Sequence, residues 1–144
     1  MGRSDVTTVL LDTHVLVWLM QGVERFSDQK KTVIREAANA DSLGVAAITP
    51  WEIGMLASKS RLTLPMDVGQ WLDAAFNRLG IGLIPLSPEI SVASSYLPGA
   101  FHNDPADRMI VASARHLNAL LITEDRAILA YAQLGHVQAV SPSQ

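Results

Sequence analysis

Short, mostly apolar runs recur along the chain, and each is followed by a polar or turn-forming residue. These runs cover residues 7–11, 42–48, 81–86, 119–123 and 136–140. Runs of this length without strict alternation are typical of strands that are buried on both faces, as in parallel sheets. The pattern therefore predicts a central parallel sheet of four to five strands.

The segments between these runs have helical spacing. Residues 67–79 show it most clearly, because their apolar side chains fall on one face and Gly80 follows the last turn. Further helices are expected at 14–21, 28–39, 88–96, 105–118 and 126–134. Strands that alternate with helices in this way predict an α/β fold with three layers, α/β/α, around the sheet.

One helix start carries a detailed prediction. Thr49, Pro50 and Glu52 follow the second apolar run directly. Thr is a common N-cap, Pro is favoured at the first helical position, and an acid three residues after the cap completes a capping box. We therefore expect Thr49 to cap a helix that runs to about residue 60, with Glu52 at its third position.

The length of 144 residues and the 49% apolar content fit one globular domain over residues 1–144. No linker, internal repeat or low-complexity segment interrupts the pattern. We expect an ordered core over about residues 6–140, with a frayed end at residues 141–144.

Composition limits the chemistry. The chain has no cysteine, which excludes disulfides and thiolate metal sites and leaves oxygen or its 4 histidines as metal ligands. A net charge of −3 argues against bulk electrostatic coating of nucleic acid, but a metal bound by carboxylates could supply positive charge locally. No apolar run is long enough to span a bilayer, and the start MGRSDVTT lacks a signal-peptide h-region, so a cytoplasmic protein without membrane contact is expected.

Four acids stand at comparable places in this pattern: Asp12, Glu52, Asp107 and Asp125. Three of them follow the ends of predicted strands, where an open parallel sheet binds its ligands. Asp107 lies in the first turn of a helix, and it reaches the same edge only if the loop at residues 98–104 brings that helix start there.

Each acid also has a purely structural explanation. Asp12 and Asp125 could cap the helices that follow them, and Glu52 and Asp107 could satisfy free N–H groups in a first turn. Asp104, directly before Pro105, is an N-cap candidate. Converging carboxylates, however, repel one another and lose solvation unless a cation holds them. Oxygen ligands without cysteine suit Mg²⁺ or Mn²⁺.

The sequence resembles the PIN-domain ribonucleases, in particular the VapC toxins of bacterial toxin–antitoxin pairs. Four motifs carry the resemblance in order along almost the whole chain: VLLDTHVLVWL (9–19), ITPWEIGMLASKSRLTL (48–64), HNDPADRMIVASA (102–114) and LLITEDRAI (120–128). The resemblance implies an endoribonuclease that hydrolyses RNA phosphodiester bonds with a metal-activated water, a small antitoxin partner and a homodimer.

Residue by residue, the resemblance implies that four acids bind Mg²⁺ or Mn²⁺ and carry catalysis: Asp12, Glu52, Asp107 and Asp125. Thr13 and Thr123 would be hydroxyls that orient the carboxylates. The lesser candidates depart from the commonest pattern or have another explanation: Asp104, Arg108 and His14. His14 or His102 could contact phosphate or base, although a lone histidine is more often structural.

Two other functions compete with the ribonuclease. A haloacid-dehalogenase-like phosphatase also begins with a strand and an Asp, but it needs a second Asp two residues later, where this chain has His14. A non-catalytic α/β protein-binding module would use the acids as caps only, and Mn²⁺ would then give no specific stabilisation.

Two groups of side chains each have two possible roles, one at a contact surface and one that is purely structural. Trp18, Trp51 and Trp71 could serve a partner interface or the core. Cations on the predicted second helix, among them Lys30, could guide RNA or form a solvated face.

Overall fold

The computed structural model describes residues 7–144, which form five strands and seven helices. The start of the expected ordered core at about residue 6, and most of the MGRSDVTT start, lie outside the described residues. The strands are short: β1 (Val9–Leu11), β2 (Leu43–Ala46), β3 (Gly82–Ile84), β4 (Leu120–Ile122) and β5 (Gln138–Val140). All four neighbouring pairs are parallel, in the order β3-β2-β1-β4-β5. The predicted parallel sheet is confirmed.

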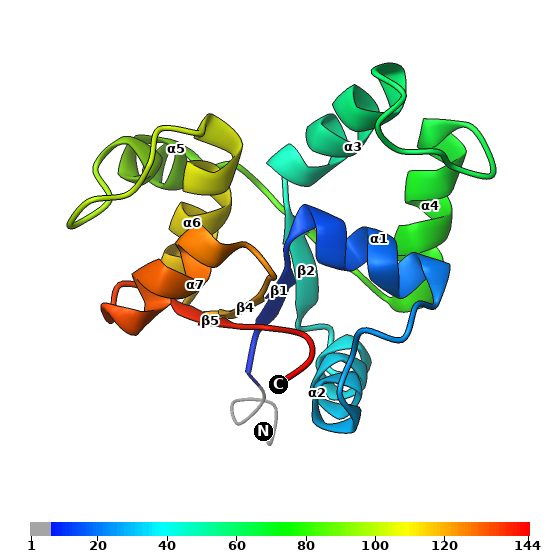
Figure 1. Cartoon of the computed structure of the whole chain (residues 1–144), viewed down its shortest axis with the longest axis horizontal. Coiled ribbons are helices and arrows are strands. Elements are labelled where there is room, and N and C mark those ends of the chain that lie inside the picture. The colour runs from blue at the N-terminus through cyan, green and yellow to red at the C-terminus, as the bar shows by residue number, and fades with distance from the viewer. Residues whose placement is uncertain (1–6) are drawn as a thin grey trace.

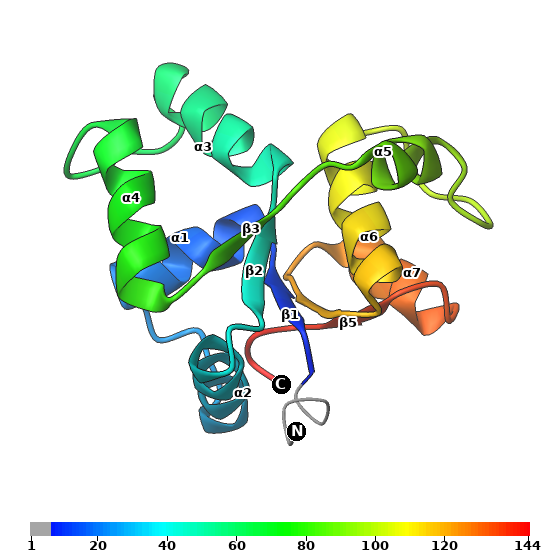
Figure 2. The same ribbon diagram turned by 180° about the vertical axis from the view of Figure 1, so that it is seen from behind.

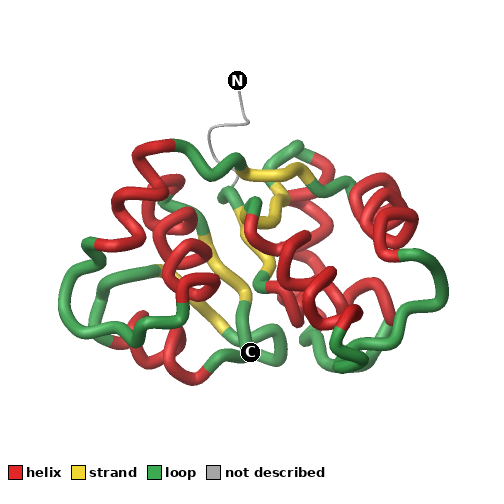
Figure 3. The backbone as a smooth tube through the Cα atoms, turned by 90° about the horizontal axis from the view of Figure 1, so that it is seen from above, coloured by secondary structure: helices red, strands yellow, loops and turns green. Residues whose placement is uncertain are grey.

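Helices cover both faces of this sheet. They are α1 (Thr13–Gln21), α2 (Asp28–Asn39), α3 (Ile48–Ser58), α4 (Val68–Leu79), α5 (Pro88–Ser95), α6 (Pro105–Leu117) and α7 (Arg126–Gln133). In Figures 1 and 2, α1, α2 and α4 lie on one side of the strands and α5, α6 and α7 on the other. The view from above in Figure 3 shows the strands between the two groups of helices. The fold is therefore the expected three-layer α/β/α arrangement.

The two helical layers produce two hydrophobic clusters, because successive side chains of a strand point to opposite faces. Val9 and Leu11 of β1 join the cluster under α1, α2 and α4, whereas Leu10 joins the cluster under α5, α6 and α7. All three side chains are at most 1% exposed. A strand buried on both faces needs a continuous apolar run, which is the pattern that the sequence shows.

The start of α3 differs from the expectation. The helix begins at Ile48, its N-cap is Ala47, and no side chain caps it. Thr49, expected to be the cap, is fully buried, and its hydroxyl lies 3.0 Å from the hydroxyl of Thr13. The hydroxyl therefore serves a contact between two helices instead of a cap, and Glu52 occupies the fifth helical position, not the third.

The last residues also differ from the expectation of a frayed end. The N–H of Ser27, the N-cap of α2, donates to the carbonyl of Pro142 at 2.9 Å. The ammonium of Lys30 donates to the carbonyl oxygen of Gln144 at 2.5 Å. Lys30 is only 7% exposed, so it is not free to guide RNA. Residues 141–144 thus pack against the beginning of α2.

Within residues 7–144, no helix has the length and apolar character needed to cross a membrane.

Candidate active site

Asp12 lies directly after β1 and is the N-cap of α1. Its Oδ1 accepts the N–H of Thr13 at 2.8 Å, and its Oδ2 accepts the hydroxyl of Thr123 at 2.6 Å. Burial raises the pKa of the Asp12 carboxyl, while the hydrogen bonds from Thr123 and Thr13 oppose that shift. Asp12 is therefore a buried carboxylate whose orientation is fixed by two donors.

Thr123 also connects Asp12 to the second acid at a strand end. It follows β4 directly, and its hydroxyl oxygen accepts the N–H of Asp125 at 2.9 Å. Asp125 is the N-cap of α7, and its Oδ1 accepts the N–H of Ile128 at 3.0 Å. One threonine hydroxyl thus links the Asp12 carboxylate at the end of β1 to the backbone N–H of Asp125 just past β4.

Glu52 reaches the same place from α3. The hydroxyl of Thr13 donates to Glu52 Oε1 at 2.5 Å. A hydroxyl has one proton, so the contact between Thr13 and Thr49 must use the proton of Thr49. Burial raises the pKa of Glu52, the bond from Thr13 lowers it, and the nearby charge of Asp12 raises it further. The sequence did not indicate that Thr49 belongs to this series of hydrogen bonds, because its position is also typical of an N-cap.

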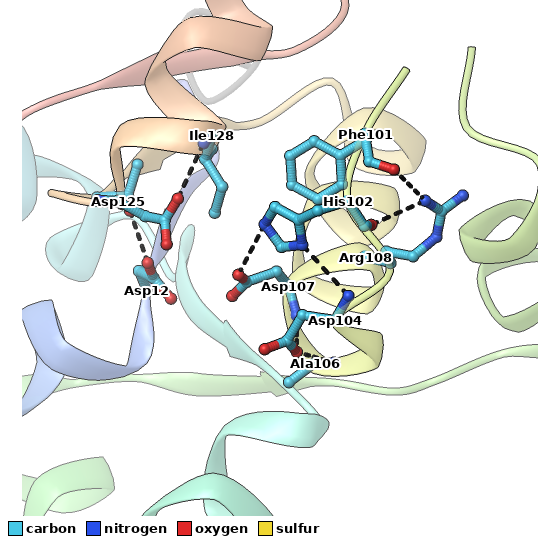
Figure 4. Close-up of polar contacts among 10 residues, drawn as sticks. Asp12, Phe101, His102, Asp104, Ala106, Asp107, Arg108, Asp125 and Ile128 are labelled. Carbon is cyan, nitrogen blue, oxygen red and sulfur yellow. Dashed lines mark hydrogen bonds and ion pairs between the residues drawn. The ribbon is translucent and has the colours of Figure 1, made fainter. Parts of the chain in front are cut away.

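Asp104 and Asp107 lie at the start of α6. Asp104 is the N-cap, and its Oδ1 accepts the N–H groups of Ala106 at 2.9 Å and Asp107 at 3.3 Å, which confirms the predicted cap. Pro105 is the first helical residue, so Asp107 is the third, as expected. Figure 4 shows the Asp107 carboxylate pointing toward Asp12 and Asp125. The loop at residues 98–104 therefore does bring the start of α6 to the carboxyl edge of the sheet.

The pKa of Asp107 is raised far above its ordinary value of 3.8. It rises to about 7, first through burial and then through the charges of four carboxylates: Asp125, Asp12, Asp104 and Glu52. The nearest counter-group is His102, whose Nε2 lies 3.2 Å from Asp107 Oδ2. The ionised form of Asp107 is therefore disfavoured until positive charge arrives.

A cavity of about 350 Å³ contains the acids at the carboxyl edge of the sheet. Its lining residues are Asp12, His14, Trp18, Glu52, Asp104, Asp107, Glu124 and Asp125. The four acids singled out in the sequence therefore meet in one cavity, together with two of the lesser candidates. Glu124 and Trp18 were missed: Glu124 directly precedes Asp125, and Trp18 stands one helical turn after His14.

Arg108 does not line this cavity. Its guanidinium donates to three backbone carbonyls, those of Ser94 at 2.8 Å, Phe101 at 2.9 Å and His102 at 3.0 Å. These bonds hold the loop that precedes α6, so Arg108 acts on the position of the loop and not on the contents of the cavity.

The donor set fits a hard divalent cation. Carboxylate oxygens dominate the cavity, and hydroxyl groups orient two of them, as Mg²⁺ and Mn²⁺ sites require. Burial first, and then the charges of neighbouring carboxylates, raise the pKa values of Asp12, Glu52 and Asp107, and a cation would offset both effects. His102, Asp107 and Asp125 also offer one ligand atom each within 4.8 Å of one another.

The fold and this acid-lined edge are those of a PIN domain. Residues 9–134 match the model of the PIN-domain family, and the chain belongs to that family. It is similar to ribonuclease VapC22 of Mycobacterium tuberculosis, with 35% identity over 123 residues that cover 85% of this chain and 91% of VapC22.

Solved structures share the fold. DNA-bound VapBC from Salmonella typhimurium aligns with a TM-score of 0.68 at 9% identity, over 94% of this chain and 98% of that one. A toxin–antitoxin complex from Klebsiella pneumoniae aligns with a TM-score of 0.61 at 21% identity, over 94% of this chain and 98% of that one. At these identities the likeness establishes the fold alone.

Proposed function

We propose that this protein is a Mg²⁺- or Mn²⁺-dependent endoribonuclease and the toxin of a toxin–antitoxin pair. The observation that carries the proposal is the convergence of Asp12, Glu52, Asp107 and Asp125 in one cavity at the carboxyl edge of the sheet. Membership of the PIN-domain family and the similarity to ribonuclease VapC22 support the reaction class.

In this proposal Asp12, Glu52, Asp107 and Asp125 hold the cation. A bound divalent cation supplies a water of lowered pKa and polarises the phosphodiester. Asp12 and Glu52 keep fixed orientations because Thr123 and Thr13 donate to them. A carboxylate of the cluster would accept the proton of the water that attacks the phosphorus, and the P–O bond to the leaving oxygen would break. The other acids would hold the cation that the phosphate contacts.

The raised pKa of Asp107 has a direct role in this scheme. With a pKa of about 7, this carboxyl is partly protonated near neutral pH when no cation is present. Binding of a cation requires the ionised form, so it releases this proton. The affinity for Mg²⁺ should therefore fall as the pH drops below about 7.

The partners proposed are RNA as the substrate, a cognate antitoxin protein and a second copy of this chain in a homodimer, all inside the cell. Structural neighbours that are toxin–antitoxin complexes support the antitoxin. Surface aromatic side chains support protein contacts, since Trp51 on α3 is 59% exposed and Tyr96 after α5 is 80% exposed. Trp71, by contrast, is a core residue.

A non-catalytic binding module is the competing function, and a specific observation favours it. Asp12, Asp104 and Asp125 do cap helices, so capping alone accounts for their presence. Capping does not account for the burial of Asp12 or for the raised pKa of Asp107. Thermal unfolding with and without Mn²⁺ separates the two functions: a metal site predicts a specific rise in Tm, and a set of caps predicts none.

RNA cleavage by the purified protein tests the proposal. Cleavage should require Mg²⁺ or Mn²⁺, stop with EDTA and be lost in Asp107→Asn. The matched control is Asp67→Asn, because Asp67 caps α4 through Gly69 and Gln70 outside the cavity, and Asn is an equally good cap. Cleavage that persists in EDTA, or a folded Asp107→Asn protein with native activity, would refute the proposal.

A further inference from the structure

His102 lies in the loop before α6 and contacts the site through both ring nitrogens. Its Nδ1 accepts the backbone N–H of Asp104 at 3.2 Å. Its Nε2 lies 3.2 Å from Oδ2 of Asp107. Figure 4 shows the ring beside the start of α6, with contacts to the Asp107 carboxylate and to the backbone nitrogen of Asp104. His102 therefore connects the cap of α6 to one of the acids proposed to hold the cation.

The contact at Nδ1 determines what Nε2 can do. A backbone N–H only donates, so Nδ1 must present its lone pair to Asp104. In a neutral imidazole the proton is then on Nε2, which faces Oδ2 of Asp107, an acceptor in the ionised form that binds a cation. A nitrogen that carries a proton has no lone pair for a metal ion. In this geometry His102 is a hydrogen-bond donor to Asp107 and not a ligand.

We propose that His102 is a positioning residue for the metal site: its Nε2–H holds Oδ2 of Asp107 and leaves the other carboxylate oxygen for the cation. The inference rests on the proposed function, because it assigns His102 a role at the same site. His102, Asp107 and Asp125 lie close enough together for His102 to bind the cation directly. The proposal instead gives His102 the role of holding Asp107.

The surrounding loop is built to keep the ring in place. The ring of Phe101 stacks on His102 with centroids 4.3 Å apart, and the tilted ring of Tyr131 of α7 has its centroid 4.9 Å from that of Phe101. The Tyr131 hydroxyl donates to the carbonyl of Pro98. Arg108 donates to the carbonyls of both Phe101 and His102. Contacts from α6 and α7 thus fix the backbone and one face of the ring.

The strength of the effect follows from the exposure of the pair. The His102 side chain is 38% exposed and that of Asp107 is 19% exposed, so water competes with the hydrogen bond. Partners that orient metal ligands change affinity by about 10–100-fold when they are removed. For a pair that is partly open to solvent we expect the lower end, about tenfold.

Two substitutions separate the functions of the two ring nitrogens. His102→Asn retains an acceptor near the position of Nδ1 for the Asp104 N–H, but its side chain is too short to reach Asp107. His102→Gln places an amide N–H near the position of Nε2 and retains the donor to Asp107. A positioning role predicts Mn²⁺ affinity about tenfold weaker in His102→Asn and near the native value in His102→Gln.

Calorimetric titration of Mn²⁺ into each folded protein, with electron spin echo modulation of the bound Mn²⁺, provides the test. We expect the native protein and His102→Gln to have the same ¹⁴N modulation, since no nitrogen of residue 102 is bound to the ion. Loss of a ¹⁴N coupling in His102→Gln would make His102 a ligand and overturn the proposal. Native affinity in His102→Asn would also overturn it, because the loop contact alone would then be sufficient.

The results that would refute the proposed function differ from those that would refute the role of His102. If the native protein neither binds Mn²⁺ nor cleaves RNA with it, the metal-dependent ribonuclease itself is refuted, whatever the variants do. If the native protein does both and the two variants do not follow the predicted order, only the role of His102 is refuted.

Discussion

The two sides of the acidic cavity are held by different means. On the threonine-held side, Asp12 and Glu52 accept hydroxyl hydrogen bonds from Thr123 and Thr13, which are at most 1% exposed. On the loop-held side, Asp107 stands in the first turn of α6 and contacts His102, an exposed residue of the preceding loop. Buried hydrogen bonds fix the carboxylates of the first side, whereas a solvent-accessible contact orients Asp107 on the second.

The two sides therefore differ in how much they must change when a cation binds. The threonine-held side has its donors in place before a cation arrives, so its carboxylates need little reorganisation. The loop-held side has a carboxyl with a pKa of about 7 and one exposed partner, so its protonation state changes near neutral pH and on binding of a cation. Substitutions on the two sides should therefore have distinguishable effects.

The largest expected effect is from Asp12→Asn. It removes a carboxylate charge and a buried acceptor at once, so Mg²⁺-dependent cleavage should fall by more than about 100-fold, the upper range for residues that only orient ligands. Rates measured at saturating RNA check this, with circular dichroism as the control for folding. A reduction of less than tenfold in the folded variant would argue against a direct role of Asp12.

Thr123→Val should have the next largest effect. The change keeps the shape of the side chain but removes the donor to Asp12 and the acceptor for the Asp125 N–H. We expect a loss of about 10–100-fold in Mn²⁺ affinity, measured by calorimetry. Thr63→Val is the matched control, because Thr63 is exposed and lies outside the cavity. Equal affinities in the two variants would contradict the role given to the threonine-held side.

The pH dependence of stability tests the loop-held side. The folded-state pKa of Asp107 lies above its ordinary value of 3.8, so ionisation of this group destabilises the metal-free fold. The penalty is complete above the folded pKa of about 7 and decreases as the pH falls toward the ordinary value. When the pH falls from 8 to 6, the Tm of the metal-free protein should therefore rise by on the order of a few degrees.

The comparison for this prediction is Asp107→Asn, which cannot ionise at that position. Its Tm should change less than that of the native protein over the same pH range. Identical pH profiles of the two metal-free proteins would show that Asp107 is not the group responsible.

Tyr131→Phe should have the smallest effect. It removes the hydrogen bond to the Pro98 carbonyl but leaves the ring that packs on Phe101. The loss should be about 1 kcal/mol in the free energy of unfolding by urea. Tyr96→Phe is the control, because Tyr96 is 80% exposed and should be neutral. A large loss of cleavage without a loss of stability would mean that the loop contributes more to catalysis than its contacts suggest.

The sequence predicts the acids at the strand ends and the Asp104 cap better than it predicts the side-chain contacts that orient the acids. Asp12 and Asp125 could be placed from the strand pattern alone, because the carboxyl ends of parallel strands form one edge. The roles of Thr13 and Thr123 entered only through the family resemblance. The contact that sets the ring of His102 depends on Phe101, Tyr131 and Arg108, which come from separate elements, and no local pattern encodes it.

Two expectations were wrong for a common reason. Thr49 has the local features of an N-cap, and residues 141–144 have those of a free end. In each case a distant partner determines the outcome: Thr13 lies 36 residues from Thr49, and Lys30 lies 114 residues from Gln144. Local propensity ranks the conformations of a segment, but tertiary contacts choose among them.

The central claim is that both sides of the cavity bind one divalent cation together. Calorimetric titration of Mn²⁺ into the metal-free native protein, Asp12→Asn and Asp107→Asn tests it most directly. We predict saturable binding by the native protein and strongly weakened binding by each variant, although the two residues are held on opposite sides. Binding by the native protein that neither substitution weakens would contradict the claim.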